Sequence, residues 1–392
     1  MPDGFHAQFG IFIPPEESAS RRTLLGGGSA YRGDGMEIRK YLKLMVEKDA
    51  SDMFYRAGCN VRMRIDGEVV TVDDTIITLD EINSSVKDLT SNELRDFFTK
   101  NLDVDFGLYV PELEHRFRIS IFMQRNWPAM VIRNIRSYIS TFEELSLPAE
   151  VLQKLAMERK GLILLTGSAG SGKSTTIASM IEYINNNAHK HILTVEEPIE
   201  FTFKDKKSII NQRELGLDVS SYSVALRAFT LQSPDVIFIS NIRDYKTMSA
   251  VITAAETGVL VFSTLHTVNA SQSVERIINF FPPHQHEEVR YQLSSLLKGV
   301  ISLRLVPRAD NKGRVPAHEV MLLTPTISRL IREGKLWEIS QFIEDGSVFG
   351  MQSFSQCLIK LYKEGKISEE EALRFADNKD EFILAMRGIK KV

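Results

Sequence analysis

The sequence predicts an α/β protein in which a small mixed α/β domain precedes a larger domain built on a parallel sheet. Three observations predict this class. Apolar strands alternate with amphipathic helices beyond about residue 148, a glycine-rich loop follows the first of these strands, and shorter strands fill the region before it. We expect a flexible tail at 1–35, the small domain at 36–136, a linker at 137–147 and the large domain at 148–392.

The bulk composition excludes several classes of protein. The chain has 392 residues, of which 43% are hydrophobic and 25% charged, as in soluble globular proteins of two or three domains. A formal net charge of −3 gives no overall attraction to nucleic acid. Two cysteines cannot form a four-ligand zinc site and favour a reduced, cytosolic setting. We find no apolar run long enough to span a bilayer and no secretion signal.

The elements of the small domain follow from local patterns. The tail is rich in Gly, Ser and Pro, which is typical of flexible segments. From Met36, the segment MEIRKYLKLMVEKDASD has helical spacing. The segments VRMRIDGEVV, EHRFRISIFMQ and PAMVIRNI are typical of strands, and Asp66-Gly67 in the first of them signals a hairpin.

The large domain begins with the strand GLILLTG, followed by the amphipathic helix STTIASMIEYINN. The segments HILTV, DVIFIS and GVLVFSTL are three further apolar strands, and we expect mostly helices in the C-terminal region. Between the first strand and helix, GSAGSGKS fits the pattern G-x-x-x-x-G-K-[ST]. The strand before the motif and the helix after it distinguish a phosphate-binding loop from an ordinary glycine-rich turn.

The chemistry of this loop predicts a site for ATP and Mg²⁺. Glycines let the backbone curl so that N–H groups face phosphates, and the following helix adds its positive end. Lys173 would reach the β and γ phosphates, and Ser174 would ligate Mg²⁺. The predicted nucleotide-binding residues of the loop are Gly167, Ser168, Gly170, Ser171, Gly172, Lys173, Ser174 and Thr175.

Three later strands of the large domain end in polar residues, namely Glu196-Glu197, Asn241 and His266. In a doubly wound sheet, the carboxyl ends of the strands line the ligand crevice. Glu196 or Glu197 could orient or deprotonate the attacking water, and His266 could sense the γ-phosphate through a hydrogen bond. Each residue alone is equally compatible with a solvated strand end, but as a set behind a phosphate loop they favour hydrolysis.

Longer segments of the chain resemble the PilT/PilU family of type IV pilus retraction ATPases, which are hexameric motors of the secretion ATPase superfamily. The resemblance extends from about residue 36 to the C-terminus and includes HILTVEEPIEF, INQRELG, SPDVIFISNIRD and AAETGVLVFSTLHT. TPTISRLIREGK resembles the C-terminal helical signature of that family. The resemblance implies a RecA-like P-loop NTPase domain behind a PAS-like N-terminal domain, and it does not separate the PilT branch from the PilU branch.

The resemblance also implies roles for single residues. Glu196 matches the catalytic glutamate of the family's aspartate box, Glu197 stands where that box usually has Asp, and His266 lies in the histidine box. In HRFRIS, a period of two places Arg116 and Arg118 on one face of a strand. Arginines of this strand reach the nucleotide in the family, whereas without the resemblance a solvated strand face would be the simpler interpretation.

Asn241 is the main departure from the family. The atypical Walker B motif G-E-x-R-D keeps Arg243 and Asp244, but Ser240 and Asn241 replace its Gly and Glu. Two adjacent changes are more typical of natural divergence than of a designed inactive variant. Asparagine brings neither negative charge nor basicity, so hydrolysis could fall by about 10²–10⁴. The loss would be smaller if Glu196 activates the water.

Two functions remain open at this point. The chain could be a cytoplasmic homohexameric motor at the inner face of the membrane, retracting pili for twitching motility through a pilus platform protein. It could instead be a PilU-like accessory subunit that hydrolyses ATP weakly and acts with an active PilT paralogue. Pilus assembly is disfavoured because the family's extension motors carry an extra N-terminal domain and usually a cysteine-rich metal site. Nucleic acid is disfavoured as a partner because the sequence has no basic stripe.

Overall fold

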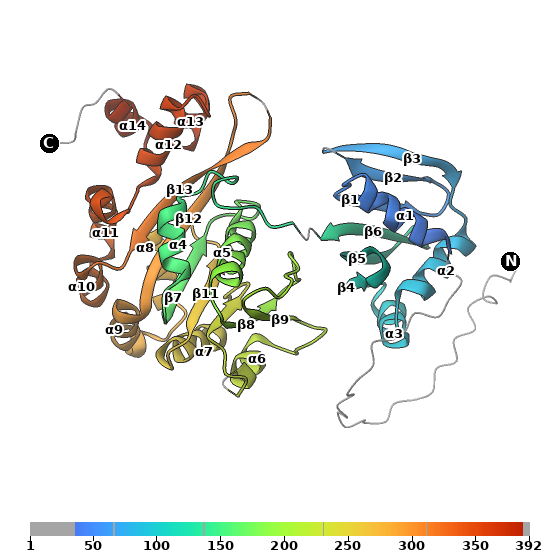
Figure 1. Cartoon of the computed structure of the whole chain (residues 1–392), viewed down its shortest axis with the longest axis horizontal. Helices are drawn as coiled ribbons and strands as arrows, with labels where there is room; N and C mark the ends of the chain where they lie inside the picture. Colours follow the sequence, from blue (N-terminus) through green and yellow to red (C-terminus); the bar gives the residue numbers. More distant parts are fainter. Residues whose placement is uncertain (1–35, 66, 136–137, 230, 311, 387–392) are drawn as a thin grey trace, which may run out of the picture.

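A computed structural model describes the chain at residues 36–65, 67–135, 138–229, 231–310 and 312–386. The predicted tail at 1–35 lies outside the described residues. The chain forms two domains, each built on its own sheet (Figure 1). Within the described ranges, no helix combines the length and the apolarity that crossing a membrane requires.

The small domain has a six-stranded antiparallel sheet in the order β3-β2-β1-β6-β5-β4. Its strands are β1 (Asp52–Arg56), β2 (Asn60–Ile65), β3 (Glu68–Ile76), β4 (Asp103–Val110), β5 (His115–Gln124) and β6 (Trp127–Ile135). Its helices are α1 (Met36–Glu47), α2 (Leu79–Leu89), α3 (Asn92–Asn101) and the 3₁₀ turn η1 (Pro111–Leu113). Ile65 pairs with Glu68 and Gly67 has a φ of +89°, so β2 and β3 form the predicted hairpin, although Asp66 lies outside the described residues.

The large domain has a seven-stranded sheet in the order β13-β12-β7-β11-β10-β8-β9. All neighbouring pairs are parallel except β12 with β13, which makes the sheet mixed. The strands are β7 (Gly161–Thr166), β8 (His191–Glu196), β9 (Ile209–Glu214), β10 (Val236–Ile239), β11 (Leu260–Leu265), β12 (Leu297–Pro307) and β13 (Arg314–Leu322). The expectation of mostly helices in the C-terminal region was wrong for β12 and β13, which extend the sheet beyond β7.

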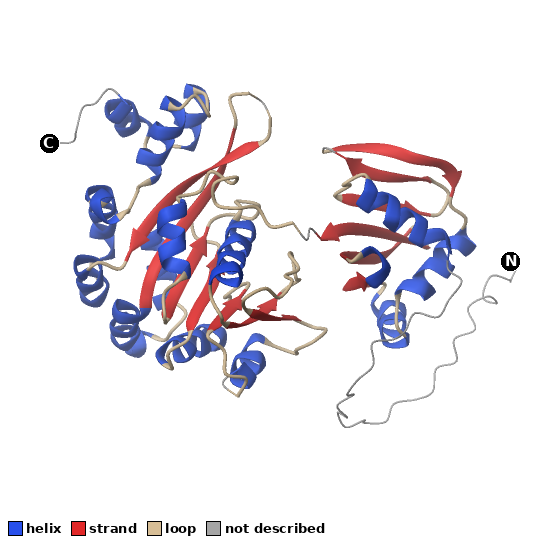
Figure 2. Cartoon of the chain, viewed as in Figure 1, coloured by secondary structure: helices blue, strands red, loops and turns tan. Residues whose placement is uncertain are grey.

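Helices cover both faces of the large sheet (Figure 2). The central strands β7, β11 and β10 are buried on both sides. In β7, Ile163 and Leu165 pack with α4 (Ala149–Ala156) and α5 (Lys173–Asn187), while Leu162 and Leu164 pack toward the opposite helices. Those helices include α6 (Tyr222–Phe229), α7 (Tyr245–Glu256), α8 (Ala270–Ile278), α9 (His286–Leu296), α10 (Pro325–Glu333) and α11 (Ile339–Asp345), with the 3₁₀ turns η2 (Pro283–Gln285), η3 (Leu336–Glu338) and η4 (Ser347–Phe349).

The last three helices, α12 (Phe354–Lys363), α13 (Glu369–Phe375) and α14 (Lys379–Met386), pack with β12 and β13 around a separate apolar cluster. Arg304 of β12 holds this region through three contacts. Its guanidinium lies 3.8 Å from the ring centroid of Phe354, donates to the carbonyl oxygen of Phe375 and pairs with Asp377 at 2.7 Å. The C-terminal helices therefore brace the end of β12 that lies beside the glycine-rich loop.

Candidate active site

The glycine-rich loop joins the end of β7 to the start of α5. Gly167, Gly170 and Gly172 have φ values of +141°, +73° and +98°, which L-residues rarely adopt. A Cβ atom at Gly167 would lie 2.5 Å from both the carbonyl oxygen of Leu303 and the hydroxyl oxygen of Ser171. Only glycine at position 167 therefore allows the loop backbone to lie this close to Leu303 and Ser171.

Lys173 lies against the glycine-rich loop. Its Nζ donates hydrogen bonds of 2.8 Å to the carbonyl oxygens of Gly167 and Ser168. Burial lowers the pKa of Lys173, and the nearby carboxylate of Glu200 opposes this shift. The hydroxyl oxygen of Ser171 is buried without a hydrogen-bond partner among the described residues. A cation and an unpaired hydroxyl at a helix N-terminus fit the phosphates of a nucleotide.

The predicted polar strand ends lie along one edge of the large sheet. Strands β7, β11, β10 and β8 are parallel neighbours in that order. The glycine-rich loop, His266, Asn241 and Glu196 follow or end these strands, so they come to the same edge.

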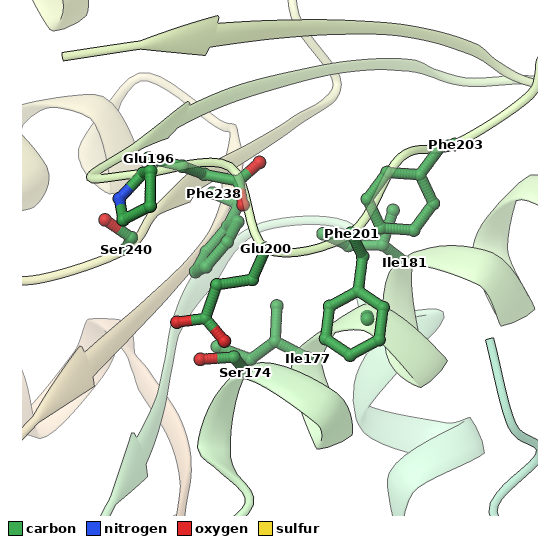
Figure 3. Close-up of a pocket in the computed structure, with 11 residues that line it drawn as sticks. Ser174, Ile177, Ile181, Glu196, Glu200, Phe201, Phe203, Phe238 and Ser240 are labelled. Carbon is green, nitrogen blue, oxygen red and sulfur yellow. The ribbon is translucent and has the colours of Figure 1, made fainter. Parts of the chain in front are cut away.

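A pocket lies between the first turns of α5 and the segment after β8 (Figure 3). In Figure 3 the carboxylate of Glu200 points toward Ser174, and the side chains of Phe201 and Phe203 lie together on another side of the pocket. The pocket is lined by Ser174, Ile177, Ala178, Ile181, Glu196, Pro198, Glu200, Phe201, Phe203, Phe238 and Ser240. Of the predicted site residues, Ser174 and Glu196 meet here, whereas Glu197, Asn241 and His266 lie outside this lining.

Glu196 is a buried carboxylate at the end of β8. Its Oε1 accepts hydrogen bonds from Thr194 Oγ1 at 2.6 Å and from Gln212 Nε2 at 3.1 Å. Burial raises the pKa of Glu196 to about 7, and the hydrogen bonds from Thr194, Gln212 and the backbone of Glu200 oppose the shift. A carboxylate with this pKa can accept a proton near neutral pH.

Glu197 has different surroundings from its neighbour. Its side chain is 38% exposed and pairs with Arg243 at 3.1 Å. Its backbone N–H donates to Ser240 Oγ at 3.1 Å, and the hydroxyl of Tyr222 shares a hydrogen bond of 2.9 Å with the same Oγ. Ser240, which replaces the glycine of the family motif, thus links the turn after β8 to α6. Of the two glutamates, Glu196 has the surroundings that suit a general base.

Asn241 is 8% exposed, and its Oδ1 has no hydrogen-bond partner among the described residues. An unpaired buried amide oxygen is costly and suits a site that a further group completes. The neighbouring Asp244 has a structural task, because its side chain accepts from Thr247 N at 2.8 Å and caps α7.

His266 lies beside the glycine-rich loop at the end of β11. Burial lowers the pKa of His266, the charges of Lys173 and Arg243 lower it further, and a hydrogen bond to the backbone of Gly167 opposes them. The imidazole is therefore held mainly neutral near physiological pH, next to the place where phosphates would bind.

The two predicted arginines of β5 pair with different domains. Arg116 Nη2 donates to Glu214 Oε2 of the large domain at 2.7 Å, whereas Arg118 pairs at 2.8 Å with Asp105 on the adjacent strand of its own sheet. Both partners of the first pair are largely buried, with exposed fractions of 19% and 6%. Contact of either arginine with nucleotide stays a prediction.

A second hollow flanks the glycine-rich loop on the side of Thr175, and basic side chains border it. Its lining includes Arg308 and Arg314 beside the loop, together with residues 144–147. The hollow adjoins the loop at Ser171, Gly172 and Thr175, and within it Arg308 pairs with Asp310 at 3.1 Å.

Sequence reasoning missed several residues of the site. It assigned no role to Glu200, although this residue follows Glu196 within the segment EEPIE. Nor did it identify Gln212, Tyr222 or Glu214, whose contacts join segments that lie far apart along the chain. Carboxylates repeated soon after a strand end were the only available signal, and they pointed to Glu200 alone.

These features together define a P-loop nucleoside triphosphatase. A profile of the family described as type II/IV secretion system protein matches residues 36–383. The chain belongs to this family and, within it, to the PilT/PilU group of type IV pilus ATPases.

The chain is similar over most of its length to members of this group. It is 41% identical over 352 residues to the type IV pilus ATPase PilU of Pseudomonas aeruginosa, covering 90% of this chain and 92% of that protein. It is 39% identical over 337 residues to PilT of the same organism, covering 86% and 97%. A crystal structure of the pilus retraction motor PilT with bound ADP superposes with a TM-score of 0.81 at 42% identity, covering 88% and 98%. The predicted family and fold class are confirmed, and the two branches are not separated.

Proposed function

We propose that the chain is a motor subunit for type IV pilus retraction, acting as a cytoplasmic homohexamer on a pilus platform protein at the inner face of the membrane. One observation carries the proposal. The buried carboxylate of Glu196 and the hydroxyl of Ser174 line one pocket beside the glycine-rich loop. Similarity to both PilU and PilT supports the pilus context.

The chain's own residues can perform the main tasks of hydrolysis. The loop amides and Lys173 bind the phosphates, while Glu196 accepts a proton from the attacking water and the neutral His266 hydrogen-bonds the γ-phosphate. Ser174 would hold Mg²⁺, which when bound neutralises charge on the β and γ phosphates. The apolar side of the pocket, formed in part by Phe201, would limit the access of bulk water to this reaction.

A second candidate function is a weakly hydrolysing accessory subunit that acts with an active PilT paralogue. Asn241, with its unpaired Oδ1 in place of the family's glutamate, favours this candidate. The two functions differ in how much of the catalysis depends on the missing carboxylate.

The variant Asn241→Glu separates these two functions. If Glu196 is the base of a motor, we expect Asn241→Glu to raise kcat by less than about 10-fold, because one base already serves the reaction. Steady-state ATP hydrolysis by the purified protein measures this effect. Asn241→Gln is the matched control, since the glutamine side chain is as long as glutamate but carries no charge. A rise of about 100-fold or more with Glu, absent with Gln, would favour the accessory function.

The interdomain ion pair predicts a second effect. We propose that bound nucleotide draws Arg116 from Glu214, so that ATP binding moves the small domain against the large one. Arg116→Ala should weaken MgATP affinity by about 10-fold, the worth of one charged hydrogen bond, in a fluorescent nucleotide titration. Arg118→Ala should weaken it less, because the ion pair of Arg118 lies within the small domain. Unchanged affinity in both variants would contradict this role.

A further inference from the structure

A line of buried polar side chains runs from β7 through β12 and β13 to the start of α8. Thr166 Oγ1 donates to Ser302 Oγ at 3.0 Å, and Ser302 Oγ donates to Glu319 Oε1 at 3.4 Å. The backbone N–H of Ala270 donates to the same Oε1 at 2.8 Å. None of these residues is more than 7% exposed, so water does not compete for the bonds.

The two ends of this line lie next to two parts of the active site. Thr166 immediately precedes Gly167 of the glycine-rich loop, and Ala270 begins α8 just after the segment that carries His266. Glu319, far from both in sequence, therefore bridges the base of the phosphate loop and the histidine segment.

The start of α8 depends on Glu319 in a specific way. The first N–H groups of a helix have no partner within the helix. At α8, Asn269 Oδ1 accepts from Gln272 N at 2.9 Å, but the N–H of Ala270 points to the carboxylate of Glu319 on β13. The cap of this helix is thus partly supplied by another element.

The segment before α8 is tied to the helix as well. The hydroxyls of Thr267 and Ser273 share a hydrogen bond of 2.6 Å, and Ser273 Oγ also donates to the backbone oxygen of Asn269. A displacement of the first turn of α8 would therefore be transmitted to Thr267 and to the adjacent His266.

The hydrogen bonds from Ser302 and Ala270 do not require Glu319 to be charged. Burial raises the pKa of Glu319 to about 7, the N–H of Ala270 and the charge of Arg304 oppose the shift, and Asp377 adds to it. Oε1 can accept both hydrogen bonds whether the carboxyl group is charged or neutral. Glutamine, which offers the same oxygen at the same reach, is therefore a conservative replacement.

We propose that Glu319 is a positioning residue for ATP hydrolysis, which fixes the start of α8 and thereby holds His266 against the glycine-rich loop. This inference rests on the proposed role of His266 at the γ-phosphate. The loop itself should stay in place without Glu319, because β7 is paired on both sides by β11 and β12.

The test measures kcat and the Kd for MgATP in full-length Glu319→Ala, Glu319→Gln, His266→Ala and the double variant Glu319→Ala/His266→Ala. We expect Glu319→Ala to lower kcat by about 10-fold or more while the Kd changes by less than about 3-fold, since misplacement affects the reaction more than binding. Glu319→Gln should keep kcat within about 3-fold of the unaltered chain. In the His266→Ala background, Glu319→Ala should lower kcat little further, because both substitutions affect the same step.

Several outcomes would overturn the proposal. Additive losses in the double variant would show that Glu319 does not act through His266. An unchanged kcat in His266→Ala would remove the proposed role of His266 and this inference with it. If Glu319→Ala does not fold, Glu319→Asp and Glu319→Gln test the proposal in its place. We expect the shorter Asp side chain to lose the hydrogen bond from Ala270 N and to lower kcat more than Gln does. A folded Glu319→Gln variant whose kcat falls further than that of Glu319→Asp would contradict the proposal.

Discussion

Glu196→Gln is expected to lower kcat for ATP hydrolysis by about 10²–10⁴, because it removes the carboxylate that accepts a proton from the attacking water. The amide keeps the shape of the side chain and an oxygen for the bonds from Thr194 and Gln212. MgATP affinity should change by less than about 3-fold, since the phosphate contacts come from the glycine-rich loop. Steady-state hydrolysis and a nucleotide titration on the same preparation measure both quantities.

The pH profile gives an independent check on Glu196. Because burial raises its pKa to about 7, the base form increases as the pH rises, and kcat should increase through neutral pH before reaching a plateau. Glu197→Gln is the matched control, because Glu197 pairs with Arg243 at the surface of the same turn. Equal losses of kcat in Glu196→Gln and Glu197→Gln would contradict the role of Glu196 as the base. A kcat that does not change with pH in the unaltered chain would contradict it as well.

The same pKa shift makes a prediction about stability. A glutamate whose pKa is raised from the model-peptide value of 4.5 to about 7 in the folded state stabilises the fold most at low pH, and this contribution is lost as the pH rises through 7. Glu196→Gln carries no charge at any pH. It should therefore gain thermal stability relative to the unaltered chain above pH 7, which melting curves at several pH values would measure.

The glycine-rich loop could be predicted from the sequence because its determinants are local. A buried strand, the spaced glycines and an amphipathic helix all lie within residues 161–187, and the observed β7 and α5 fall on the predicted segments. By contrast, β12 and β13 were assigned to a helical region. Their strand conformation depends on pairing with each other and with β7, which is distant in sequence.

The surroundings that decide the role of each site residue depend on contacts between distant segments. Glu196 and Glu197 are adjacent and alike in sequence, yet Glu196 is buried and accepts a hydrogen bond from Gln212, whereas Glu197 is exposed. Similarly, Arg116 and Glu214 are separated by 98 positions before the fold joins them. Residue type and spacing identify these side chains as candidates. Only their burial and their hydrogen-bond partners distinguish a general base from a surface ion pair.

Gly167→Ala should abolish tight nucleotide binding. At this position φ is +141°, and an added Cβ would lie 2.5 Å from the carbonyl oxygen of Leu303, which belongs to the paired strand β12 and cannot move freely. The loop must therefore shift. Loss of two charge-assisted hydrogen bonds to phosphate, each worth about 1.5 kcal/mol, lowers MgATP affinity by about 100-fold.

Gly170→Ala separates this steric effect from backbone strain in general. Gly170 also has a positive φ, of +73°, but a Cβ atom there would meet nothing within 4 Å. Its cost is then only the left-handed conformation, about 1–2 kcal/mol, so affinity should fall by about 5- to 30-fold, less than in Gly167→Ala. A nucleotide titration of both variants, with melting curves to confirm folding, compares the two. Equal affinities would mean that close packing of Gly167 against β12 does not shape the phosphate site.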